Sequence, residues 1–208
     1  MIGNLVISNM HPILKSVLAA KASAKIEDTQ RFIQDVLIEV NTKLWRLEER
    51  IDKEYLKTED FMNFFQRTLM KVTLDQRREK IKLFANIIVN SAMKENADEN
   101  DGRKYLFEET IDKIDEKLFG FLLKARKRDL DGLGLEAKGW RGTDEELNLL
   151  GVDSQAFQFN AEYLLGVGVM VRLPKFELDG ETGELRYHEE YFVTQYGKEF
   201  VEYVRERG

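Results

Sequence analysis

The sequence predicts a mainly α-helical protein, a helical bundle with a long heptad-patterned helix followed by a smaller α+β module. Three observations support this fold class. The 208 residues include only two prolines, Pro12 and Pro174, so long stretches contain no helix breaker. Between residues 26 and 55, apolar side chains recur at heptad spacing. After residue 142 the pattern changes, and two strand-like runs flank a turn that contains Asp179, Gly180 and Gly183.

Composition limits the class of protein further. The chain is 43% hydrophobic and contains no cysteine, so it can bury a core without disulfides or a zinc site built on cysteine. The opening segment MIGNLVISNM lacks the basic region of a secretory signal. No stretch reaches the roughly 18 to 20 apolar residues that a membrane-spanning helix needs. We therefore expect a soluble, cytoplasmic protein that uses no cofactor.

The first long element is expected to be a helix from Ile26 to Tyr55. Its apolar positions alternate at spacings of four and three, which places them on one stripe of the helix. Two interpretations remain open: the stripe packs into the core of a bundle, or it forms the interface of a homodimeric coiled coil. The candidate interface residues are Ile33, Leu37, Val40, Leu44, Leu47 and Ile51.

Three further helices complete the predicted bundle, which spans residues 1–128. Thr58, followed by Glu59 and Asp60, is typical of a helix N-cap with an acidic first turn. Helices are then expected over about 74–93 and 103–128, separated by the polar loop KENADENDG. The glycine-rich residues 129–142 are predicted to be a linker.

The remaining residues, 143–208, predict a second module. Thr143 and Glu146 match a capping box, and Ser154 is expected to cap a helix that Gly166 closes. A hairpin follows, and Thr194 is expected to cap the last helix. This order of helix, helix, hairpin and helix predicts a winged-helix-like α+β module.

Charge is distributed unevenly and bears on the kind of partner. The net charge is -6, and from Thr143 onward 14 Asp and Glu face 6 Lys and Arg. The helix that would read DNA, SQAFQFNAEYLL, has no Lys or Arg. A protein partner is therefore favoured over nucleic acid. The candidate phosphate contacts lie in two basic groups within the bundle: Arg77, Arg78, Lys124, Arg126, Lys127 and Arg128.

Four segments together resemble a known bacterial family. They are KIKLFANIIVNSAM at 80–93, FEETIDKIDEKLFGFL at 107–122, LLGVGVMVRLP at 164–174 and YFVTQYGKEFVEYV at 191–204. In order and spacing they are similar to the abortive-infection alpha proteins and related bacterial domains of unknown function. The resemblance implies a role near defence against phages or mobile elements, with no enzyme activity to transfer.

Motifs for catalysis are not found. His11 and His188 are far apart and lack metal-ligand spacing, and no GxSxG or GxxxxGK[ST] sequence occurs. The carboxylates Glu48, Glu49 and Asp52 sit among basic residues, which suggests ion pairs on a helix surface. The sequence thus predicts a non-enzymatic interaction protein. The alternative is a winged-helix transcriptional regulator that binds DNA.

Overall fold

The chain is mainly helical and contains one small antiparallel sheet in the part that the structure describes. The structure is a computed structural model that describes residues 26–75, 77–98, 101–129 and 139–205. It divides into two compact units, residues 1–115 with 203–208 (unit 1) and residues 116–202 (unit 2). Among the described residues, no helix has both the length and the apolar character needed to cross a lipid bilayer.

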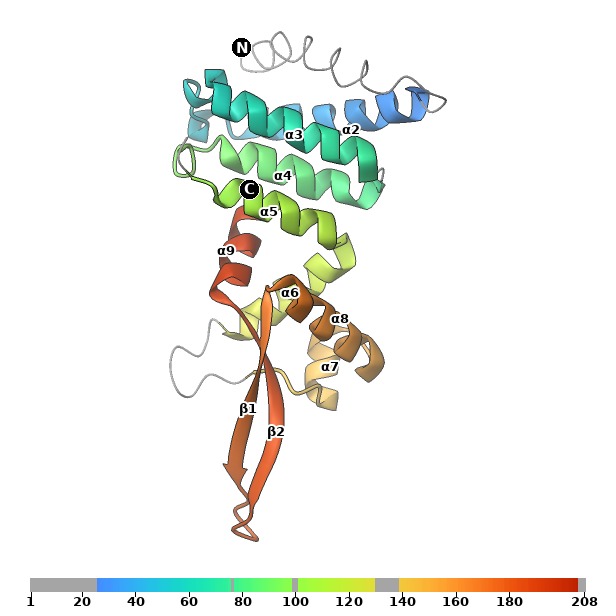
Figure 1. The fold of residues 1–208 in the computed structure, drawn as a ribbon, viewed down its shortest axis with the longest axis vertical. Helices are drawn as coiled ribbons and strands as arrows, with labels where there is room; N and C mark the ends of the chain where they lie inside the picture. Colours follow the sequence, from blue (N-terminus) through green and yellow to red (C-terminus); the bar gives the residue numbers. More distant parts are fainter. Residues whose placement is uncertain (1–25, 76, 99–100, 130–138, 206–208) are drawn as a thin grey trace. The chain divides into compact units, whose positions relative to one another are not determined.

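The described residues of unit 1 form a stack of four helices in which α4 is central. Its helices are α2 (Ile26–Arg46), α3 (Glu59–Asp75), α4 (Ile81–Ser91) and α5 (Arg103–Lys113). Figure 1 shows them side by side, and α4 packs against each of the other three. Every residue from Leu83 to Met93 is buried, because helix α4 has neighbours on all sides.

Helix α2 ends earlier than the heptad pattern predicts. It was expected to continue to Tyr55, but it stops at Arg46 and is followed by a 3-10 turn over Glu48–Arg50. Ile51 is extended and forms an antiparallel bridge with Met93. The Asp52 N–H donates to the Ala92 carbonyl at 2.8 Å. Leu47 and Ile51 are both buried, as expected for apolar residues. They reach the core through a 3-10 turn and not as part of a helix.

A second difference concerns the helix predicted over 103–128. It is divided into α5 and α6 (Glu116–Asp129), because Ile114 takes an extended backbone conformation. The boundary between the units falls at this break, whereas the sequence predicted a linker over residues 129–142 between the two parts. Helix α6 belongs to unit 2 because it packs against α7, α8 and strand β2.

Unit 2 combines short helices with a hairpin. After α6 come α7 (Asp144–Leu150), α8 (Ser154–Val167), β1 (Met170–Leu178), β2 (Leu185–Val193) and α9 (Gln195–Val204). The strands pair in register from Met170 with Val193 to Leu178 with Leu185. The hairpin projects away from α6, α7 and α8, as Figure 1 shows.

A third, very short β segment joins this sheet. Trp140 and Tyr191 exchange two backbone hydrogen bonds, each 2.9 Å long. The Trp140 side chain is buried, and its indole N–H donates to the Ala125 carbonyl of α6 at 3.0 Å. Residues 139–142 of the predicted linker are therefore part of the structure of unit 2. Residues 130–138 of that linker lie outside the described residues.

The predicted helix caps are mostly confirmed. Thr143 and Glu146 form the capping box of α7, and the Thr194 hydroxyl accepts from the Gly197 N–H of α9 at 2.9 Å. Helix α8 differs, because Asp153 rather than Ser154 is its N-cap. It also continues past Gly166 and ends at Gly168, whose φ of 88° suits glycine.

Candidate functional site

Six of the exposed large apolar side chains of unit 2 lie on helix α8 and on one face of the hairpin. Alternation along the strands places Phe176 and Leu178 of β1 on the same face as Tyr187 and Leu185 of β2. We call the following six residues the α8–hairpin surface: Phe159, Tyr163, Phe176, Leu178, Leu185 and Tyr187.

Aromatic rings pair on both parts of this surface. Phe176 and Tyr187 are directly opposite each other in the register, with 5.6 Å between ring centroids. Their exposed fractions are 61% and 59%. On α8, Phe159 and Tyr163 stack at 6.3 Å, and Phe159 is 66% exposed. Large aromatic side chains left this open to water are unusual away from interaction sites.

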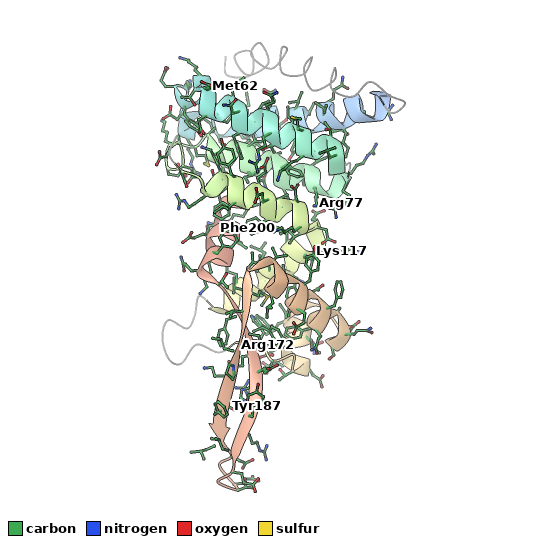
Figure 2. All side chains as sticks on the ribbon, viewed as in Figure 1. Met62, Arg77, Lys117, Arg172, Tyr187 and Phe200 are labelled. Atoms are coloured by element: carbon green, nitrogen blue, oxygen red, sulfur yellow. The ribbon has the colours of Figure 1, made fainter. Side chains whose placement is uncertain are left out.

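A polar junction connects α8 to the same face of the hairpin. The Glu162 carboxylate accepts from the Tyr191 hydroxyl at 2.6 Å and from Arg172 at 3.0 Å. Arg172 also lies 3.4 Å from Glu189. Burial, with the hydrogen bond to Glu162, raises the pKa of Tyr191. This junction connects α8 to the hairpin. Figure 2 shows Tyr187 farther along the hairpin than Arg172.

Unit 2 is acidic around this surface. From Glu116 to Glu202 the sequence has 17 Asp and Glu against 11 Lys and Arg, and from Gly139 to Glu202 it has 13 against 5. Three of the cations are engaged with carboxylates: Arg141 with Glu177 and Glu190, Arg172 with Glu162 and Glu189, and Arg186 with Asp179. Lys175 lies over the Phe192 ring at 5.7 Å. Carboxylates therefore outnumber cations in unit 2, and the unit has a net negative charge.

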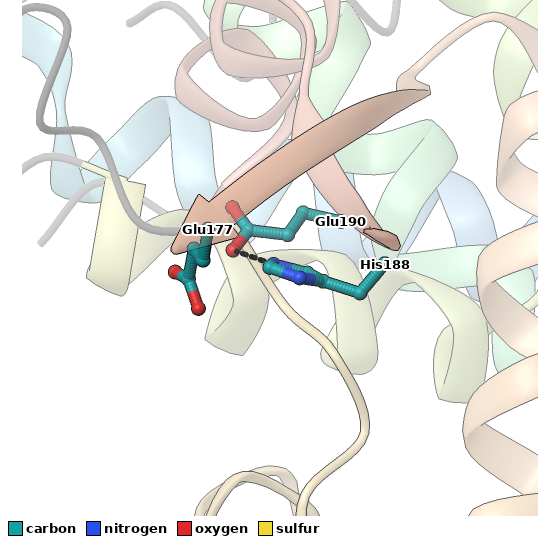
Figure 3. A group of neighbouring side chains, drawn as sticks. All are labelled: Glu177, His188 and Glu190. Carbon is teal, nitrogen blue, oxygen red and sulfur yellow. Dashed lines mark hydrogen bonds and ion pairs between the residues drawn. The ribbon is translucent and has the colours of Figure 1, made fainter. Parts of the chain in front are cut away.

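The opposite face of the hairpin carries a group that sequence analysis missed. Glu177, His188 and Glu190 offer ligand atoms within 4.8 Å of one another, as metal sites do (Figure 3). His188 Nε2 lies 3.2 Å from Glu190 Oε1. The available signal was the HEE sequence at 188–190, because strand alternation puts its first and last residues on one face. Glu177 lies on the other strand, and only the pairing register of the two strands shows that it is close to His188.

Arg141 explains this group without a metal. Its guanidinium contacts Glu190 at 2.7 Å and Glu177 at 2.5 Å. The buried Glu190 also accepts from the Gly139 N–H at 2.9 Å. Burial alone would raise the pKa of Glu190, but the hydrogen bonds from Gly139, Arg141 and His188 outweigh it and keep that pKa below its usual range. We interpret the group as an ion-pair network that attaches residues 139–141 to the hairpin.

The structure places the predicted phosphate contacts in different environments. Arg77 and Arg78 are exposed before α4, and the Arg77 guanidinium donates to the Asp112 carbonyl at 3.4 Å. Lys124 donates to the Leu150 carbonyl at 2.7 Å, and the buried Arg126 pairs with Glu202. These two cations therefore stabilise contacts within unit 2. The side chains of Lys127 and Arg128 lie outside the described part of the chain.

The heptad residues are largely occupied by the fold of unit 1. The buried members are Ile33, Val40, Leu44, Leu47 and Ile51. Leu37 is half-buried. Among the α2 side chains that the structure describes, Ile38 and Trp45 are the large apolar ones left open to solvent, at 65% and 67% exposed. Their spacing of seven residues places them on one side of the helix.

A groove of about 900 Å³ lies beside the end of α2. It is lined by residues 45–54 and Lys94, and so contains Glu48, Glu49 and Asp52. Glu48 is paired with Lys53 at 3.0 Å, and this hydrogen bond and charge lower its pKa. The Asp52 carboxylate accepts from the N–H groups of Glu54 and Tyr55. General acid–base catalysis requires a pKa near the working pH, so a lowered carboxylate pKa does not favour catalysis here.

Comparisons of the chain with protein-family models, with curated proteins and with solved structures find no match. The functional assignment therefore depends on the geometry and chemistry of the chain itself.

Proposed function

We propose that the chain is a non-enzymatic interaction protein whose unit 2 is a winged-helix-like module that binds another protein. The observation that carries this proposal is the α8–hairpin surface. Its exposed residues are aromatic and aliphatic, and it lies within an acidic unit. Aromatic side chains at the centre of a contact contribute most of the binding energy in many protein interfaces.

The topology of unit 2 supports the winged-helix-like interpretation. The order is helix α6, the short β segment at Trp140, helices α7 and α8, and then the β1–β2 hairpin. Strand β2 lies between Trp140 and β1. In such a module α8 corresponds to the recognition helix and the hairpin to the wing.

The chemistry of α8 favours protein over DNA as the partner. Affinity for DNA comes mainly from Lys and Arg that neutralise phosphates. Helix α8 has neither residue, and its exposed polar side chains include Gln155 and Gln158. Arg172, the cation at the base of the hairpin, is already paired with two carboxylates.

We also propose a biological setting and an assembly. The resemblance to abortive-infection alpha proteins supports a role in defence against phages or mobile elements. The absence of cysteine suits the reducing cytoplasm. The heptad residues are largely buried within unit 1, so the support for a homodimer through α2 comes from the exposed Ile38 and Trp45.

A DNA-binding measurement tests the choice of partner. Labelled duplex and single-stranded DNA are titrated with the full chain at roughly 50 and 200 mM salt, where phosphate binding weakens steeply. We expect no change in fluorescence anisotropy at either salt concentration. Salt-sensitive binding that is lost in Arg77→Gln with Arg78→Gln would contradict the proposal and favour the DNA-binding regulator.

A further inference from the structure

We infer that the α8–hairpin surface binds a positively charged, apolar segment of a protein partner. The inference depends on the proposed function, and it adds the contact surface and the chemistry of the partner. Three properties of the surface support it: the exposed rings, the contacts between α8 and the hairpin, and the surrounding negative charge.

The apolar part of the surface is continuous along the hairpin. Phe176 faces Tyr187 across the strands, and the next pair on that face toward the turn is Leu178 with Leu185. Leu178 and Leu185 are 73% and 64% exposed. Four adjacent apolar side chains on one open face give a partner segment a place to bury its own apolar groups.

The surface is organised before binding. Ring pairing restrains Phe176 with Tyr187, and Phe159 with Tyr163. Glu162 connects α8 to the hairpin through Tyr191 and Arg172. Side chains that are already ordered lose less conformational entropy on binding, so a larger part of the contact energy contributes to affinity.

Charge selects the kind of segment. Glu162 and Glu189 lie on the same side as the aromatic pairs, and Glu181 and Glu184 lie beside the hairpin turn. Arg172, the cation on this face, is shared between two carboxylates, so the face remains negative. A partner that carries Lys or Arg is attracted, whereas the same acidic face of a second copy is repelled.

Selection from a library of short random peptides tests this chemistry on the full chain. We expect the enriched peptides to combine Lys or Arg with aromatic or aliphatic residues, and to bind more weakly as salt increases. In the variant Phe176→Ser with Tyr187→Ser, we expect their Kd to rise by at least about tenfold, the effect of losing buried aromatic anchors. Both replaced side chains are exposed, and far-UV circular dichroism checks that the variant is folded.

A matched control distinguishes this surface from general stickiness. Leu149 of α7 is 64% exposed and lies outside the surface, so Leu149→Ser should leave the Kd unchanged. Enrichment of acidic peptides, or no enrichment, would overturn the inference. Peptides that bind Phe176→Ser with Tyr187→Ser normally but not Ile38→Ser with Trp45→Ser would also overturn it, while leaving an interaction role intact. Salt-sensitive DNA binding without peptide enrichment would overturn both proposals.

Discussion

Lys104 is buried in unit 1, where its ammonium group is held by a network of phenols and one carboxylate. Only 1% of its side chain is exposed, and it pairs with Asp60 and contacts the Tyr55 hydroxyl at 2.8 Å. The Tyr105 hydroxyl also donates to Asp60, at 3.0 Å. Burial, with the hydrogen bond to Asp60, raises the pKa of Tyr105 to about 12. The network connects the first turns of α3 and α5.

Replacing Asp60 by Asn should destabilise unit 1. The change removes the only carboxylate that the structure shows paired with Lys104, and a buried charge without its partner is costly. We expect the free energy of unfolding to fall by about 3 kcal/mol in urea denaturation. Glu54→Gln is the control, because Glu54 forms a surface pair with Lys57 and is 83% exposed. Equal effects of the two substitutions would contradict the importance of the buried pair.

Two carboxylates should give the protein an acid-sensitive stability. Burial would raise the pKa of Asp60, but hydrogen bonds from Lys104 and Tyr55 outweigh it, so that its pKa is lowered, as is that of Glu190. A lowered folded-state pKa contributes stability that is present above the unfolded-state pKa and is lost as pH falls through the folded-state value. We expect urea midpoints to decrease below about pH 4. Asp60→Asn should show a smaller decrease, and an unchanged pH profile in this variant would argue against the assignment.

At the scale of single elements, two glycines in unit 2 should respond in opposite ways to alanine. A Cβ at Gly197 of α9 would lie 2.3 Å from the Val169 carbonyl oxygen, whereas a Cβ at Gly166 of α8 would have no atom within 4 Å. Gly197→Ala must therefore displace α9 from the base of β1. We expect it to lower the melting temperature, whereas Gly166→Ala should stabilise α8 by about 0.5 to 1 kcal/mol. Similar effects at both positions would show that the close approach is not maintained in solution.

Local chemistry explains which elements could be predicted from the sequence. The caps at Thr58, Thr143 and Thr194 depend on residues within three positions, and all three accept the expected backbone hydrogen bond. The ends of α2 and α5 were not predicted, because the apolar period continues across Leu47 and Ile114 while the backbone turns. Both residues are buried although the helix has ended, so periodicity alone could not locate the break.

The candidate site was predicted less completely than the fold. The hairpin and α8 follow from sequence patterns, but the six residues of the α8–hairpin surface were not singled out, because exposure depends on which neighbours cover a side chain. The Arg141 network joins residues up to 51 positions apart, and neither spacing nor composition indicates it. The resemblance to abortive-infection alpha proteins and the homodimer remain predictions.

At the scale of the whole molecule, the assembly depends on which side of α2 is available. Leu44 is buried in the core of unit 1, whereas Ile38 and Trp45 are exposed. We expect light scattering to show a dimer for the wild type and a folded monomer for Ile38→Glu with Trp45→Glu. Leu44→Glu should instead unfold unit 1, because it buries an unpaired charge. A wild-type monomer at tens of micromolar protein (roughly the range for a moderate-affinity dimer) would contradict this assembly.

The position of Pro174 has a consequence for how the molecule behaves at high concentration. The N–H and C=O groups of Tyr191 bond to Trp140, on the side of β2 away from β1. Because these groups alternate in direction along a strand, those of Glu190 point toward Leu173 of β1. The backbone groups of the next residue, Pro174, therefore point toward the open edge of β1. An open edge beside Phe176 and Leu178 could template strand addition and fibril growth, and a proline there removes one of the donors that such growth needs. We expect Pro174→Val to shorten the lag of thioflavin fluorescence without a change in melting temperature. The same hairpin that offers an apolar face to a partner would thus be protected along its edge from its own copies.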